Sequence, residues 1–382
     1  MPQWCRQYRR AAHNNTTHIR RQNFYALPSA QWEMLSEPPF SMLDTFSKVD
    51  DAIDANANLA EAILASGLVM MGYPDPTQDA SDSRPEWHDC ASKVSLDKAR
   101  STLHQLYRDW SAEGAAERQA CYGPILQDLT DLLVNPQEVE EQILVLVPGA
   151  GLGRLVFELC RAGFCTQGNE ISYHQLLASS YMLNHTSMAE MWSLYPFATT
   201  FSNNLTRAHQ LLEVKIPDVH PGSEVMHGDM SMTTGDFCVV YTKMEYKDFF
   251  HAIATVFFID TAADLVTYVL TAKHCLRPGG LWCNLGPLLW HFDGESARGD
   301  KSHEGDDVER WRQKDPRLDE AGENETLGRF EMSHDEVMAL VERLGFVILK
   351  QEIVSPGTGY IQNPNSMLQN IYRPVHWVAR KR

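Results

Sequence analysis

Hydrophobic residues recur at helical spacing over the first third of the chain. This spacing predicts helices across residues 1–72 and again across 95–133. Residues 73–85 separate the two stretches and are rich in Pro, Asp and Ser, which predicts a loop. We therefore expect residues 1–135 to form a helical N-terminal region that contributes to the functional site.

The pattern changes at Gln142, where short apolar runs begin to alternate with helical segments. Four runs have the character of buried strands, namely 143–147, 164–170, 249–259 and 281–285. Helical segments follow them at 155–163, 174–183 and 265–275. Two last strands, 347–354 and 376–379, are predicted to pair as antiparallel neighbours. The alternation predicts an α/β fold with a doubly wound, Rossmann-like sheet over residues 136–382.

An acidic segment interrupts this second region. Residues 293–329 contain twelve acidic and seven basic residues and almost no apolar ones. Such a composition is typical of a surface insertion. The segment leaves from the end of a predicted strand, so a lid over the site is the alternative.

Composition narrows the classes of partner. The chain has 382 residues and a formal net charge of −17, which disfavours nucleic acid and anionic lipid and favours a small cationic or neutral substrate. Its eight cysteines form no Cys-x-x-Cys pair, so we expect neither a metal site nor disulfides. No apolar run is long enough to span a bilayer, and the N-terminus lacks an apolar signal core. We therefore expect a cytoplasmic protein.

A glycine-rich loop follows the first predicted strand. Gly149, Gly151 and Gly153 would let the backbone turn sharply and approach a ligand, with the amide groups of a helix N-terminus directed outward. Glu170 ends the next strand, where a carboxylate can accept hydrogen bonds from two ribose hydroxyls. The alternatives are an ordinary turn and a solvated carboxylate. The register of loop and acid favours a nucleoside-containing cofactor.

Features downstream of the glycine-rich loop, together with the spacing of the loop itself, favour methyl transfer over hydride transfer. Asp236 and Phe237 follow the third αβ unit, where an acid and an aromatic ring suit the edge and face of adenine, although Asp236 could simply form a turn. The turn at 277–280 and the terminal strand pair are rare in nicotinamide-binding folds. The glycine-rich loop also departs from the Gly-x-Gly-x-x-Gly spacing of nicotinamide-binding folds. The sequence therefore predicts S-adenosylmethionine as the cofactor.

Two residues at predicted strand ends are candidates for binding the substrate. Asp260 follows the predicted strand 249–259, at the carboxyl edge where doubly wound sheets bind ligands. It could instead cap a helix that begins at Thr261. His291 follows the fifth strand near the same edge, and a purely structural histidine is the alternative.

Ten motifs, in this order, resemble the carnosine N-methyltransferase family. The strongest are Val-Pro-Gly-Ala-Gly-Leu-Gly-Arg-Leu, Phe-Phe-Ile-Asp-Thr-Ala and Asn-Leu-Gly-Pro-Leu-Leu-x-His-Phe, at 147–155, 257–262 and 284–292. The others lie at 24–28, 108–111, 117–122, 167–170, 201–204, 216–219 and 235–237. The resemblance covers nearly the whole chain. It implies a seven-stranded class I methyltransferase sheet with an antiparallel C-terminal strand.

The resemblance also implies an activity and a set of site residues. The family methylates an imidazole nitrogen of histidine-containing dipeptides, giving anserine from carnosine. By motif, the residues that would contact the cofactor are Gln105, Arg108, Gly149, Glu170, Asp236, Phe237 and Val256. Those that would hold the dipeptide are Asp260, His291 and Tyr372. The family further implies a homodimer and a location in the cytoplasm and the nucleus.

Imidazole chemistry suggests a role for Asp260. The ring is mostly neutral at pH 7, so one nitrogen carries a free lone pair. We expect Asp260 to accept the N–H of the other nitrogen.

Three alternative functions remain for the protein, namely a methyltransferase acting on histidine in another peptide or protein, a nicotinamide-dependent oxidoreductase, and a non-catalytic cofactor-binding subunit.

Overall fold

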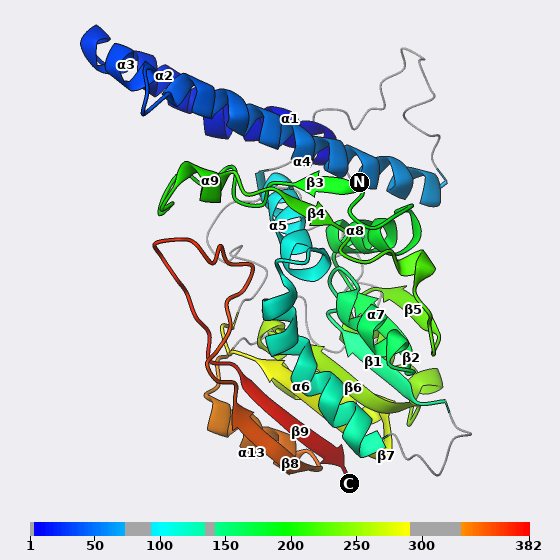
Figure 1. Ribbon diagram of the computed structural model, residues 1–382. Coiled ribbons are helices and arrows are strands. Elements are labelled where there is room, and N and C mark those ends of the chain that lie inside the picture. The colour runs from blue at the N-terminus through cyan, green and yellow to red at the C-terminus, as the bar shows by residue number, and fades with distance from the viewer. Residues whose placement is uncertain (1–3, 73–92, 134–141, 291–329) are drawn as a thin grey trace, which may run out of the picture.

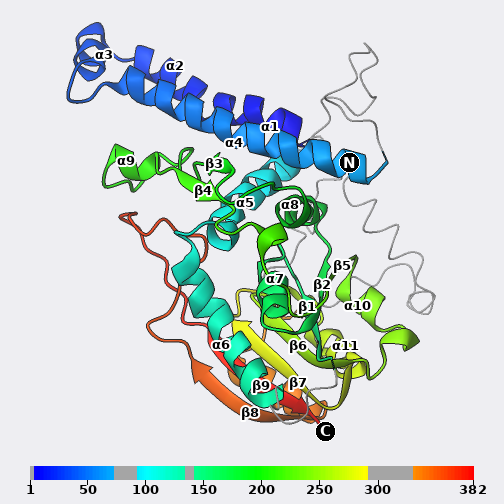
Figure 2. The same cartoon turned by 45° about the vertical axis from the view of Figure 1, so that its right-hand side comes forward.

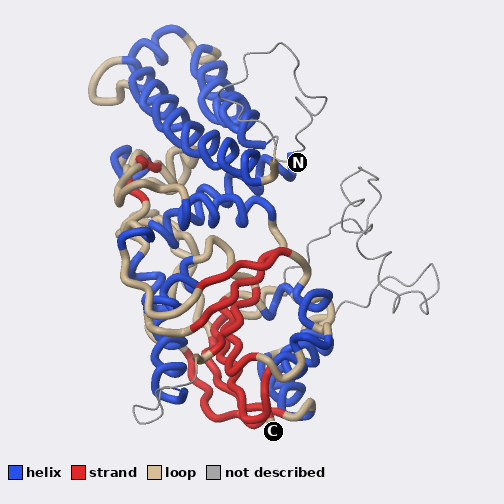
Figure 3. The backbone as a smooth tube through the Cα atoms, turned by 90° about the vertical axis from the view of Figure 1, so that its right-hand side faces the viewer, coloured by secondary structure: helices blue, strands red, loops and turns tan. Residues whose placement is uncertain are grey.

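The computed structural model describes residues 4–72, 93–133, 142–290 and 330–382. Its centre is a seven-stranded sheet with the strand order β5-β2-β1-β6-β7-β9-β8 (Figure 1). Helices cover both faces of this sheet, and a group of helices from the N-terminal part lies across one end (Figure 3). The predicted doubly wound α/β fold is confirmed.

Five strands form the parallel part of the sheet. They are β1 (Leu144–Pro148), β2 (Cys165–Glu170), β5 (Met230–Thr234), β6 (Phe250–Val256) and β7 (Leu276–Gly286). β1 pairs with β2 on one side and with β6 on the other, and all these pairings are parallel. The strand order therefore reverses beside β1. Open sheets of this kind bind ligands at the carboxyl ends of the strands that flank this reversal.

The last two strands complete the sheet in the predicted way. β8 (Phe346–Ile353) and β9 (Val375–Lys381) pair with each other antiparallel, and β9 also pairs antiparallel with β7. β7 is longer than predicted, because it begins at Leu276 and includes the turn residues 277–280.

Each face of the sheet carries its own hydrophobic core. On one face, α6 (Ala115–Leu133) and α7 (Arg154–Arg161) bury apolar side chains against β1, β6 and β7. On the other, α10 (Phe237–Tyr241), α11 (Leu265–Cys275) and α13 (His334–Arg343) do the same (Figure 2). α13 was not predicted, although it begins with a capping box formed by Ser333 and Glu336.

The predicted helices of the N-terminal part are also present. They are α1 (Trp4–His13), the π-helix η1 (Asn14–His18), α2 (Ile19–Tyr25), α3 (Ser29–Ser36), α4 (Met42–Met70) and α5 (Lys93–Trp110). α4 and α5 share a core with α7 and with α8 (Tyr173–Asn184). This core joins the N-terminal helices to the sheet domain, and it brings α5 close to the glycine loop.

Short elements connect the larger ones. A two-stranded antiparallel hairpin consists of β3 (Trp192–Leu194) and β4 (Val214–Ile216), with α9 (Arg207–Gln210) between its strands. Three 3₁₀ turns follow, η2 (Pro221–Ser223), η3 (Met244–Tyr246) and η4 (Ile259–Thr261). None of these elements was predicted, because each is too short to show a period.

Some predictions concern residues outside the described part. The loop 73–85, the boundary at 135 and the acidic segment 293–329 belong to this group. Within the described part, no helix is both long and apolar enough to cross a membrane. The six cysteines described there are all free thiols.

An ionic cluster holds α1 against α4. His13 bonds Asp50 through Nδ1 and Asp54 through Nε2, both at 2.9 Å, and Arg9 bonds Asp54 at 2.6 Å. Burial would lower the pKa of His13, but the hydrogen bonds to the two carboxylates outweigh it and the pKa is raised. A raised pKa means that protonation of His13 stabilises the folded state.

This stabilisation depends on pH. It is fully present below the ordinary histidine pKa and is lost as the pH rises through the raised value. His13→Asn should therefore lower the melting temperature at pH 6 by about 2 °C and have little effect at pH 9. Thermal unfolding at the two pH values checks this. Lys48→Gln, which removes an exposed pair with Asp44 on the same helix, is the control and should change neither value.

Candidate active site

The glycine loop has the backbone that its sequence predicts. Gly149, Gly151 and Gly153 have φ values of 66°, 57° and 77°, a region that favours glycine. A Cβ on Gly149 would lie 2.5 Å from the Phe258 ring, and one on Gly153 would lie 2.5 Å from Ser179 Oγ. A Cβ on Gly151 would meet nothing closer than 3.7 Å. The loop is therefore tightly packed at both ends, and at its middle residue a Cβ would make only ordinary van der Waals contacts.

Glu170 lies directly beside Gly151. Its Oε2 accepts a hydrogen bond of 2.9 Å from the Gly151 N–H, and its Oε1 accepts bonds from the N–H groups of Ile171 and Ser172. The side chain is buried. Burial raises the pKa of Glu170, and the three backbone bonds act against this shift. A buried carboxylate at the end of β2, tied to the glycine loop, fits the predicted contact with ribose.

The predicted adenine residues lie at the start of α10. Asp236 caps this helix, since its Oδ1 accepts bonds from the N–H groups of Cys238 and Val239. The turn that the sequence allowed for Asp236 is thus present, and its contact with adenine stays a prediction. Phe237 is buried with its ring edge-on to Phe258, at a centroid distance of 5.7 Å. Because Phe258 also packs on Gly149, the two predicted cofactor segments meet through this ring.

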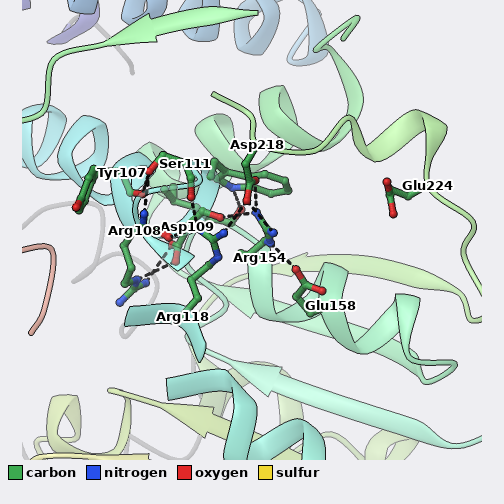
Figure 4. A network of polar contacts seen from close by, with 12 residues as sticks. Tyr107, Arg108, Asp109, Ser111, Arg118, Arg154, Glu158, Asp218 and Glu224 are labelled. Atoms are coloured by element: carbon green, nitrogen blue, oxygen red, sulfur yellow. Dashed lines mark hydrogen bonds and ion pairs between the residues drawn. The ribbon is translucent and has the colours of Figure 1, made fainter. Parts of the chain in front are cut away.

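α5 brings two further predicted residues to the loop. Gln105 Oε1 accepts a hydrogen bond of 2.9 Å from Gln175 Nε2, and Gln175 Oε1 is the side-chain atom that a Cβ on Gly151 would approach, at 3.7 Å. Arg108 is almost fully buried and bonds the carboxylate of Asp109 through Nε and Nη2, at 2.8 and 3.0 Å (Figure 4). The upstream helix therefore lies beside the cofactor loop, as the resemblance implies.

An aromatic cluster follows the end of β6. Val256 is the last residue of the strand, and Phe257 has the unusual φ of 52°. The ring of Phe257 lies 4.9 Å from Tyr360 and 6.2 Å from Tyr372, measured between centroids. Tyr360 in turn lies under the guanidinium of Arg108, at 4.9 Å. The cluster links the predicted dipeptide residue Tyr372 to the cofactor side of the site.

Tyr360 was not predicted from the sequence. It lies on the connection between β8 and β9, which has no period, and a backbone bridge between Thr358 and Tyr372 joins the two sides of that connection. No motif marks the pairing of these two residues. The resemblance covered only Tyr372 in this segment.

Asp260 is buried at the same edge. It is 4% exposed, and its Oδ2 accepts a bond of 2.9 Å from the Leu289 N–H, which follows β7. The prediction that Asp260 caps a helix is wrong, because α11 begins at Leu265 and is capped by Asp264. The strand predicted to reach residue 259 also stops at Val256, so Asp260 lies in η4. Its partner in the prediction, His291, lies outside the described residues.

Comparisons with known proteins identify the family of the chain. A family model described as "Carnosine N-methyltransferase" matches residues 85–382. The carnosine N-methyltransferase of Schizosaccharomyces pombe is 34% identical over 374 residues, which cover 98% of this chain and 92% of that protein. That of Rattus norvegicus is 34% identical over 376 residues, covering 98% and 84%.

A third relative matches a shorter part. "Carnosine N-methyltransferase unmet" of Drosophila melanogaster is 37% identical over 284 residues, which cover 74% of this chain and 55% of that protein. The matched family region includes α5, the glycine loop and the aromatic cluster. On this evidence, the chain belongs to the carnosine N-methyltransferase family.

Proposed function

We propose that this protein transfers a methyl group from S-adenosylmethionine to an imidazole nitrogen of carnosine, giving anserine, and that it accepts related histidine dipeptides. One observation carries the proposal. At a single edge of the sheet, the Gly151–Glu170 pair after β1 and β2 lies near the buried Asp260 after β6. The Gly151–Glu170 pair suits a nucleoside, and Asp260 suits an imidazole.

The donor set fits the cofactor. Glu170 would accept bonds from the ribose hydroxyls, and Arg108 would bind the carboxylate of the amino-acid end. Gly151 has no side chain, which lets the cofactor lie against the backbone of the loop. The remaining contacts would come from Gln105, Gly149, Asp236, Phe237 and Val256. When bound, S-adenosylmethionine supplies an electrophilic methyl group on a sulfonium centre.

Asp260 would prepare the acceptor ring. Its carboxylate accepts the N–H of one imidazole nitrogen, which leaves the lone pair of the other nitrogen free to form the new N–C bond while the S–CH3 bond of the sulfonium breaks and S-adenosylhomocysteine leaves with the electron pair on sulfur. Positive charge develops on the ring as this bond forms, and the carboxylate stabilises it. The ring N–H proton leaves afterwards, which gives the neutral methylated product. The bond from Leu289 N–H holds the carboxylate in one orientation throughout.

The aromatic cluster would position the dipeptide. Phe257, Tyr360 and Tyr372 form a wall that joins the end of β6 to the Arg108 side of the site. Such a wall can orient the ring and exclude water, and positioning supplies much of the acceleration in displacements of this kind. His291, which follows β7, would contact the same substrate.

A panel of acceptors tests the proposed function. Purified protein is incubated with S-adenosylmethionine and one acceptor, which is carnosine, homocarnosine, free histidine or a protein-derived peptide with internal histidine. The masses of the products are then measured by mass spectrometry. We expect rapid methylation of the two dipeptides and little of the others. Methylation of the peptide alone would instead favour a protein histidine methyltransferase. Calorimetry with S-adenosylhomocysteine and NAD separates the cofactor classes, and binding of NAD alone would contradict the proposal.

We also propose a homodimer present in the cytoplasm and the nucleus, as the resemblance implies. Light scattering coupled to size-exclusion chromatography would measure twice the chain mass if the dimer forms. Imaging of the tagged protein would test the location.

A further inference from the structure

The buried end of α5 has an unusual set of hydrogen-bond donors. A helix leaves its last four carbonyl groups without partners inside the helix. α5 ends at Trp110, and the carbonyls of residues 107–110 all have donors from elsewhere. These donors are Ser111 Oγ at 2.6 Å, Arg118 Nη1 at 2.6 Å, Arg154 Nη1 at 2.8 Å and the Asp218 N–H at 2.8 Å, in the order of the carbonyls. Three of the four donors come from residues distant in the sequence.

Asp218 connects the two guanidinium groups. Its Oδ2 bonds Arg118 Nη2 and its Oδ1 bonds Arg154 Nη1, both at 2.6 Å (Figure 4). The three side chains are each at most 10% exposed. Arg118 comes from α6, Arg154 begins α7, and Asp218 follows β4. Two cations at a helix C-terminus are favourable, but they repel each other when buried, and the shared carboxylate offsets this repulsion.

The same turn of α5 carries Arg108 and Asp109. Asp109 holds Nε and Nη2 of Arg108, and it is itself held by a bond of 2.8 Å from the Tyr122 hydroxyl. The turn is also tied to the glycine loop, since Trp110 Nε1 donates to the Leu152 carbonyl at 3.1 Å. The position of the Arg108 guanidinium therefore depends on how firmly the end of α5 is held against α7.

We propose that Asp218 is a positioning residue for the amino-acid end of the cofactor. By holding Arg118 and Arg154 on the last turn of α5, it fixes Arg108 where a carboxylate binds beside the glycine loop. This inference rests on the proposed function, which assigns the cofactor carboxylate to Arg108. Glu170, which ends β2, and Phe237, which begins α10, would bind the nucleoside and come from elements other than those that carry this cluster.

Two ligands separate the two ends of the site. S-adenosylhomocysteine carries the amino-acid carboxylate, whereas 5′-methylthioadenosine keeps the adenosine thioether and lacks it. Calorimetry on the full chain should show that Asp218→Asn weakens binding of S-adenosylhomocysteine about 10-fold or more and changes binding of methylthioadenosine less than about twofold. Arg108→Met should give the same pattern. Glu158→Gln, which removes the charge of another carboxylate that pairs with Arg154 but does not touch the end of α5, is the matched control and should change neither affinity.

Other outcomes would overturn the inference. Equal weakening of both ligands by Asp218→Asn would show general damage, and unchanged affinities would show that the cluster does not position Arg108. Should Asp218→Asn fail to fold, Arg118→Lys replaces it, since lysine keeps the charge but has a single nitrogen in place of Nη1, which bonds the Arg108 and Ser111 carbonyls, and Nη2, which bonds Asp218. The same selective loss is expected, and a non-selective one would contradict it. If wild-type protein bound neither ligand, the proposed function would fail, and this inference with it.

Discussion

Asp260→Asn should lower the turnover of carnosine by about 100-fold or more while leaving the affinity for S-adenosylhomocysteine unchanged. Asparagine has the same shape, and its Oδ1 can still accept the bond from the Leu289 N–H. The variant should therefore fold normally. What it loses is the negative charge beside the imidazole ring, and with it the stabilisation of the positive charge that develops during transfer.

Steady-state kinetics and calorimetry together measure this effect. Asp264→Asn is a matched control, because Asp264 lies four residues further on and caps α11. Asparagine is also a good N-cap, so this control should keep wild-type turnover and stability. Full turnover in Asp260→Asn with normal substrate affinity would show that Asp260 does not act on the ring.

Glu170→Gln should weaken S-adenosylhomocysteine and 5′-methylthioadenosine alike, by roughly 10- to 100-fold. Both ligands contain the ribose that this carboxylate would bind, and hydrogen bonds to a charged acceptor are the stronger kind. The common loss distinguishes Glu170 from Arg108 and Asp218, whose variants should affect only the ligand with a carboxylate. An unchanged affinity for both ligands would place the ribose elsewhere.

The same residue should set a pH dependence. Because burial raises the pKa of Glu170, its ionised form in the free protein is lost at a higher pH than for an ordinary glutamate. Ligand affinity of the wild type should therefore fall as the pH drops through this raised value, and Glu170→Gln should remove the dependence. The raised pKa also means that ionisation of Glu170 destabilises the free protein at neutral pH.

The sequence predicted every strand of the sheet except β5 (Met230–Thr234), because the other strands are long enough or apolar enough to show a pattern. β1, β2 and β6 are apolar runs or end in recognisable residues, and their carboxyl ends had to meet at one edge once the strands were parallel. From that register we could predict that the glycine loop and Glu170 lie side by side. Their hydrogen bond is the contact that a strand-end acid beside such a loop would be expected to make.

The sequence failed where contacts join segments without a period. Asp260 and Asp264 are both plausible caps, and only the position at which α11 begins decides between them. Tyr360 and Asp218 lie on loops, and their partners come from other parts of the chain. Asp218 belongs to the motif at 216–219, but no local pattern shows which residues it or Tyr360 contacts. Arg118 and Arg154 look like ordinary surface charges of helices, although both are buried at the end of α5.

The position of the transferred methyl group tests the central claim most directly. Purified protein is incubated with carnosine and S-adenosylmethionine carrying a labelled methyl group, and the product is fragmented by tandem mass spectrometry. We predict one labelled methyl group on the histidine fragment, co-eluting with anserine, and almost none when Asp260→Asn replaces the wild type. A label on the β-alanine amine, or no labelled dipeptide from active, ligand-binding protein, would contradict the account.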